Sequence, residues 1–100
     1  MRVAFRKTKI RDNKYIIQLN CDEEEKVFDD IDKLKEYVDK TLRYHYKNNY
    51  SEGLSDIFLK LVDLNFELEK SDNKDDFEIM CSYAEYARVL NNYHIKRGIY

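Results

Sequence analysis

Proline and tryptophan are absent from this chain of 100 residues, and glycine occurs only as Gly53 and Gly98. A phosphate-binding loop needs several glycines close together, so two isolated glycines exclude such a loop and make nucleotide-dependent catalysis unexpected. The same scarcity argues against a disordered linker. We therefore expect a single compact domain over residues 1–100.

Long apolar runs are also missing. No stretch approaches the roughly 18 apolar residues that favour a transmembrane helix. The chain begins with basic residues and lacks the apolar segment typical of a signal peptide. The sequence therefore predicts a cytoplasmic protein with no membrane partner.

Cysteine and histidine occur only twice each, as Cys21, Cys81, His45 and His94. Their spacing places no two of them on one helical turn, so neither a metal site nor a cofactor is expected. Neither cysteine precedes a helix start or a glycine turn, where thiolates are usually activated, and no catalytic residue can be named. We expect two free thiols, with Cys81 in the core and Cys21 partly exposed at a strand end, in a protein that is not an enzyme.

Residues 54–68, LSDIFLKLVDLNFEL, are apolar on nearly every side when they are read as a helix. Such a helix must be covered by other elements on most of its surface. One apolar face begins at Leu54 and Phe58, and Leu59, Val62 and Phe66 form a second face beside it. The pattern predicts a buried central helix, and the second face favours a homodimer.

The order of elements predicts an α+β fold in which residues 1–28 form a three-stranded antiparallel meander and residues 29–100 form three helices packed on one face of the sheet. The expected strands cover residues 2–10, 15–20 and 26–28, and the expected helices cover about 30–48, 55–70 and 76–96. A turn at Asp12 and Asn13 joins the first two strands, because both residues tolerate a left-handed backbone. The apolar residues of the first strand change phase along it, which predicts a β-bulge. Asp75 and Glu78 suggest a capping box for the third helix.

Positive charge gathers at the start of a chain whose net charge is −2: residues 1–20 carry six basic residues and one acid. Arg6, Lys7, Lys9 and Arg11 are the first candidates for contact with a partner, and the last three share one side of a regular strand. Three interpretations stay open: contact with an acidic protein, contact with nucleic-acid phosphates, and a solvated edge strand protected by charge.

Tyrosine is abundant, with nine residues, and a second candidate surface follows from Arg43, Tyr44, Tyr46 and Tyr50. Tyrosine and arginine anchor many protein interfaces. The alternative is that one or two of these tyrosines pack inward. A third tyrosine group, on the last helix, is expected to pack against another helix. The acidic residues 22–25 and 63–78 offer a different surface, one suited to a basic partner.

Taken together, these features favour a small non-enzymatic protein-binding module. Size, segregated charge and tyrosine content are typical of an inhibitor or regulator, of the kind that phages and mobile elements encode, that covers the surface of another protein. The alternative is a nucleic-acid-binding protein that uses the basic amino-terminal hairpin. The partner protein itself is not identified by any motif.

Overall fold

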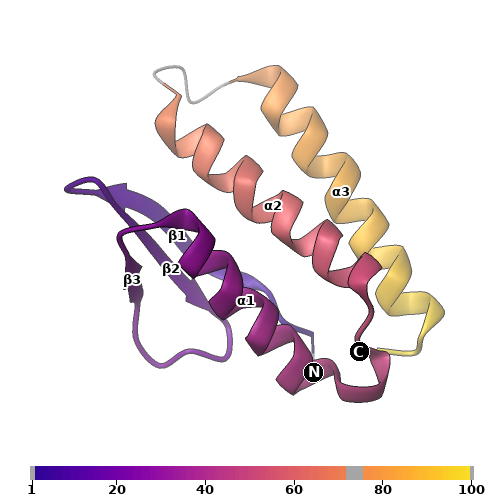
Figure 1. The fold of residues 1–100 in the computed structure, drawn as a ribbon. Coiled ribbons are helices and arrows are strands. Elements are labelled where there is room, and N and C mark those ends of the chain that lie inside the picture. Colours follow the sequence, from indigo (N-terminus) through magenta and orange to yellow (C-terminus); the bar gives the residue numbers. More distant parts are fainter. Residues whose placement is uncertain (1, 72–75, 100) are drawn as a thin grey trace.

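The computed structural model describes residues 2–71 and 76–99, and it confirms the predicted α+β fold (Figure 1). The elements follow in the order β1 (Phe5–Arg11), β2 (Lys14–Leu19), β3 (Lys26–Phe28), α1 (Ile31–Tyr46), the short 3₁₀ helix η1 (Lys47–Asn49), α2 (Glu52–Lys70) and α3 (Phe77–Lys96). The three strands form an antiparallel meander in the order β1-β2-β3. None of the described helices is both long and apolar enough to cross a membrane.

The β1–β2 hairpin follows from its turn residues. Asp12 and Asn13 have positive φ angles of 54° and 62°, as a two-residue turn between twisted strands requires. Arg11 pairs with Lys14 across the turn, and the register shifts between Phe5 and Lys7, which is the predicted bulge. Beyond the bulge, successive side chains of β1 alternate between the two faces of the sheet.

The helices form a layer on one face of this sheet. In the described part of the chain, α1 packs on β2 and β3, α2 packs on β1, and α3 packs along α2, with a further side-chain contact from its His94 to Tyr46 of α1. Figure 1 shows α3 as the outermost helix, on the far side of α2 from α1. Across the helical layer the order is therefore α1, α2, α3, and beneath it the order of the strands in the same direction is β3, β2, β1.

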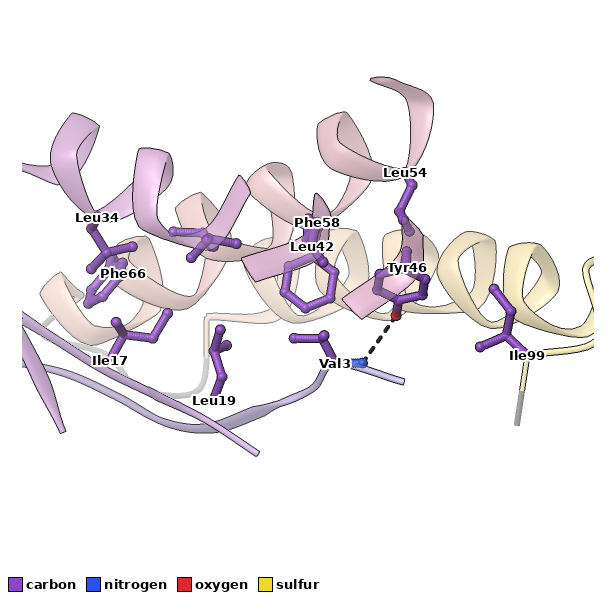
Figure 2. Close-up of a cluster of buried hydrophobic side chains, with 12 residues drawn as sticks. Val3, Ile17, Leu19, Leu34, Leu42, Tyr46, Leu54, Phe58, Phe66 and Ile99 are labelled. Atoms are coloured by element: carbon purple, nitrogen blue, oxygen red, sulfur yellow. Dashed lines mark hydrogen bonds between the residues drawn. The ribbon is translucent and has the colours of Figure 1, made fainter. Parts of the chain in front are cut away.

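A continuous apolar core lies between the sheet and the first two helices (Figure 2). Ile17 and Leu19 of β2 point into it beside Leu34 and Leu42 of α1, while Phe58 enters from α2. The phenyl ring of Phe58 lies 4.8 Å from that of Phe5. The predicted burial of the central helix is confirmed, because α2 contacts α1, β1 and α3.

The second apolar face of α2 belongs to this same core. Val62 and Phe66 are 0% and 1% exposed within one chain, and Leu59 packs against the core from a half-buried position. These residues therefore do not form a free apolar surface for a second subunit, and the homodimer predicted from them is not supported.

Side-chain caps define where each helix begins. Asp30 accepts a hydrogen bond from the Asp32 N–H, Ser51 from the Leu54 N–H, and Asp76 from the Ile79 N–H. Because Ser51 caps α2, this helix starts at Glu52, before the predicted start, and Gly53 lies in its first turn. The predicted capping residue Asp75 lies outside the described residues, and the cap of α3 is Asp76.

The third helix is covered on one side only. Its stripe of Ile79, Tyr83, Tyr86, Leu90 and Tyr93 is half-buried, as expected for a face that packs on α2. The neighbouring stripe is open: Phe77 is 77% exposed, Met80 is 50% exposed, and Cys81 and Ala84 are exposed. The prediction that Cys81 is a core residue is wrong, because the helix turns that stripe away from α2.

Candidate functional site

The outer face of the sheet, opposite the helices, gathers the basic residues of the hairpin. Thr8 pairs with the buried Ile17, so Thr8 faces the core, and the alternation of β1 turns Lys7, Lys9 and Arg11 to the other side. No described helix or strand packs over this outer face. The prediction that these three side chains share one side agrees with the register.

One carboxylate lies among these bases. Nζ of Lys7 is 2.6 Å from Oε1 of Glu25, and Nη2 of Arg11 is 3.8 Å from Oε2 of the same residue. The hydrogen bond from Lys7 is the largest cause that lowers the pKa of Glu25, and the charges of Lys7, Lys9 and Arg11 lower it further. Glu25 therefore stays ionised and neutralises only part of the cluster.

The positive surface extends onto β2. Lys14 pairs with Arg11 across the turn and faces the same side, where its Nζ lies 2.6 Å from Oδ1 of Asp29. Two residues in the middle of this face are apolar: Ile16 is 2% exposed, whereas Val27, its cross-strand partner, is 54% exposed. We call the set Lys7, Lys9, Arg11, Lys14 and Val27 the basic sheet face. It combines charge with an exposed apolar side chain.

Arg6 stands apart from this set. It is exposed and lies at the bulge between Phe5 and Lys7, where the regular alternation of β1 is interrupted. Its position is near the basic sheet face, but its side chain is not placed there by the register.

The second predicted surface, at the carboxyl end of α1, is only partly available. Tyr44 is 71% exposed, and the Arg43 guanidinium lies 4.4 Å from the ring centroid of Tyr50. This end of α1 and η1 lie far from the turn of the β1–β2 hairpin, at the opposite end of the molecule (Figure 1). The two predicted groups therefore form separate surfaces.

Tyr46 does not belong to either surface. It is 3% exposed, and its hydroxyl oxygen accepts a hydrogen bond of 3.1 Å from the Val3 N–H (Figure 2). The same hydroxyl lies 2.7 Å from Nε2 of the buried His94, and the two rings stack. Tyr46 is therefore a core residue that links the amino-terminal segment to α3, and its predicted contact with a partner is corrected.

A polar cluster that the sequence did not reveal lies in the groove between α1 and α2. Oδ1 of Asp39 accepts hydrogen bonds from the hydroxyls of Tyr50 (2.6 Å) and Ser55 (2.7 Å), and its Oδ2 accepts one from Nε of Arg43 (2.9 Å). Burial raises the pKa of Asp39, but these hydrogen bonds outweigh burial and hold it below its usual value. Only the Asp39–Arg43 spacing of one helical turn was visible in the sequence.

This groove encloses about 430 Å³, and its wall carries more acids than bases: Asp32, Glu36, Asp39, Glu52 and Asp56 against Lys35 and Arg43. The Asp39 carboxylate accepts hydrogen bonds from side chains of α1, of the loop before α2 and of α2, so the cluster joins these three segments. Its arrangement is that of a structural brace between two helices.

The thiols do not form a reactive pair. Cys21 is half-buried, and burial is the main cause that raises the pKa of its thiol, with Asp22 raising it further. Cys81 is exposed on α3. Among residues 2–71 and 76–99, no three His, Cys, Asp or Glu side chains come close enough together to hold a metal ion.

Comparison of the chain with known protein families, with characterised proteins and with solved structures found no match.

Proposed function

We propose that this chain is a non-enzymatic protein-binding module that docks its basic sheet face onto an acidic surface of another protein. As an inhibitor or regulator of the phage or mobile-element type, it would act in the cytoplasm by covering that surface. The observation that carries the proposal is the alignment of Lys7, Lys9 and Arg11 on a face that no described element covers.

The composition of the face favours a protein over a nucleic acid. Val27 adds an exposed apolar side chain next to the charges, and Glu25 places a negative charge among them. A carboxylate in this position repels phosphates, and no aromatic side chain of the three strands is placed on the outer face to stack on bases. Opposite charge on a partner would steer its approach and raise the association rate.

Exchange of Lys7, Lys9 and Arg11 for glutamate tests the proposal. We expect the triple variant to lose capture of a protein partner from nuclease-treated host lysate, and to lose the salt dependence of that binding. The matched control exchanges the exposed Lys33, Lys40 and Lys96 for glutamate, which changes the net charge equally on the helices. Equal binding by the two triple variants would refute a contact through the basic sheet face.

The alternative, nucleic-acid binding, uses the same basic residues and is separated by a titration with a fluorescent oligonucleotide. Tight binding that weakens steeply with salt, and that the triple variant loses, would favour this alternative. A protein partner that remains bound after nuclease treatment would favour the protein-binding function.

A further inference from the structure

The helical layer of this fold is wider than its sheet. The helices α1 and α2 already cover all three strands, and β1 is an edge strand with β2 on one side only. In space, α3 lies next to α2 on the side away from α1 and β3. It therefore lies past the free edge of β1 (Figure 1). There is no described strand beneath α3.

A groove occupies this place. One hollow of about 240 Å³ is bounded by Phe5 on the β1 side, Leu61 on α2 and Ala87 on α3. A second hollow of about 350 Å³ continues along the same side of α3 and is lined by Asn65, Leu68, Met80, Tyr83 and Ala84. Tyr83 borders both hollows, so they adjoin along α3, and we call the two hollows together the channel; most of the residues that line it are apolar.

Arg2 closes one end of this channel. Its Nη1 donates a hydrogen bond of 3.0 Å to Oδ1 of Asn91, and its Nε donates one of 3.0 Å to the carbonyl of Ile99. At the other end of the channel, Met80 and Ala84 line the second hollow and are exposed to solvent.

The free edge of β1 offers backbone hydrogen-bonding groups on the side of the sheet where α3 lies (Figure 1). The two-residue turn makes Arg11 and Lys14 a hydrogen-bonded pair, and such pairs alternate along an antiparallel ladder. The backbone of Lys9 is therefore hydrogen-bonded to β2. The backbone N–H and C=O groups of Thr8 and Ile10 point away from β2, towards the free edge.

We propose that an extended segment of a partner protein, with alternating acidic and apolar residues, adds to β1 as a fourth strand and fills the groove beneath α3. Its backbone would pair with Thr8 and Ile10. Its inward side chains would meet Met80, Tyr83 and Ala84, and its outward side chains would lie beside Lys7, Lys9 and Arg11. This inference rests on the protein-binding function proposed above and adds the class of partner and the mode of binding.

Charge decides between this occupant and a second copy of the chain. Antiparallel pairing of β1 with the β1 of another copy would place the lysines of the two strands on the same face, where like charges opposite one another are destabilising. An acidic strand reverses that sign. The apolar wall of the groove favours apolar residues at the alternate positions of the partner strand. The charge of β1 therefore explains the acidic positions, and the groove explains the apolar ones.

The test selects peptides from a phage-displayed random library against the protein. We expect the selected peptides to alternate acidic and apolar residues over a length close to the seven residues of β1. Selection of no peptide, or of peptides without that alternation, would overturn the proposal. Sedimentation of the protein alone then measures whether it forms a dimer. A dimer that the Thr8→Pro exchange abolishes would show that a second copy of the chain, and not an acidic partner segment, occupies the edge of β1.

Four variants test the mode of binding with the selected peptides. Thr8→Pro removes an N–H that points to the free edge, and we expect it to weaken binding about tenfold or more, whereas Thr8→Val keeps the N–H and should bind as the wild type does. Ala84→Glu places a charge in the groove and should also weaken binding. Val89→Glu is its control, since Val89 is exposed on the same helix and lines neither hollow.

The two proposals fail in different ways. If Thr8→Pro and Ala84→Glu bind as the wild type does while the Lys7, Lys9 and Arg11 triple variant loses binding, the strand-addition mode is wrong and docking by the basic sheet face remains. If binding survives in the triple variant but is lost with Ala84→Glu, the acidic character of the partner and the function proposed above are both wrong. Should Thr8→Pro fail to fold, Ala84→Glu and Val89→Glu still decide the groove.

Discussion

The helices α2 and α3 are nearly equal in length, with 19 and 20 residues, yet they differ sharply in how they are held. Seven residues of α2 are buried, and they face the sheet, α1 and α3. In α3 only His94 is buried, and the other residues of this helix are half-buried or exposed. The difference teaches that α2 is the element on which the fold depends, whereas α3 is attached along one side and anchored at its carboxyl end.

The largest expected effect comes from removing the same aromatic side chain from the two helices. Phe58→Ala in α2 should lower the free energy of unfolding by about 3–5 kcal/mol, because it leaves a cavity beside Phe5 in the centre of the core. Phe77→Ala in α3 removes a side chain that is 77% exposed and should change it by less than about 0.5 kcal/mol. Urea unfolding measures both, and comparable losses would mean that α3 is buried in solution.

The anchor of α3 should show the next largest effect. Tyr46→Phe removes the hydroxyl that accepts from the Val3 N–H and lies next to Nε2 of His94, so two buried polar groups lose their partner. We expect a loss of about 1–3 kcal/mol. Hydrogen exchange should quicken in the carboxyl-terminal half of α3 before it does in α2. Uniform loosening of both helices would show that the anchor is not local to α3.

Acid should weaken the same anchor. Burial is the main cause that lowers the pKa of His94, and the Arg2 guanidinium lowers it further. Because the folded-state pKa lies below the unfolded value of 6.5, the unfolded state binds more protons as the pH falls. The contribution to stability is therefore complete above the unfolded pKa and is lost as the pH decreases through the folded pKa.

Unfolding measured from about pH 7.5 down to about pH 5 covers the range in which histidine titrates and lies above that of most carboxylates, and comparison with a His94 variant assigns the effect to this residue. We expect the free energy of unfolding to decrease over that range in the wild type and to decrease less in His94→Gln. A glutamine can still accept a hydrogen bond from the Tyr46 hydroxyl but does not titrate. An unchanged pH slope in the variant would assign the loss to other groups.

The smallest effect should come from the exposed stripe of α3. Cys81→Ser should change the free energy of unfolding by less than about 0.5 kcal/mol, because Cys81 is exposed. In the wild type, Cys81 should react with a thiol reagent faster than Cys21, whose thiol is half-buried and has a raised pKa. A slower reaction at Cys81 would indicate that something covers this stripe in solution.

Much of the backbone could be predicted because local signals act over a few residues. Asp12 and Asn13 specify the turn, and the change of phase along β1 specifies the bulge. The apolar pattern of residues 54–68 predicted a covered helix, since a helix of that kind is unstable in water. The start of α2 was expected near residue 55, which is too late, because Ser51 caps the helix and Gly53 lies in its first turn.

The surfaces were harder to predict. The alternation of a strand places Lys7, Lys9 and Arg11 together whatever the rest of the fold does, so that part of the site was accessible from the sequence. Tyr46 was misjudged because three neighbouring tyrosines look alike, and only the position of Val3 and His94 selects the one that is buried. The Asp39 cluster draws on α1, the loop before α2, and α2 itself, so no local pattern contained it.

By itself, then, the sequence determined the order of strands and helices, the turn, the bulge and the burial of the central helix, because each depends on residues that are neighbours in the chain. Only the tertiary structure decided which apolar stripe of α3 meets α2 and which stays open, because a helix with two apolar stripes can be rotated to bury either one. The same packing decided that the helical layer extends past β1. The groove beneath α3 therefore arises from how the elements are assembled, and no single segment of the chain encodes it.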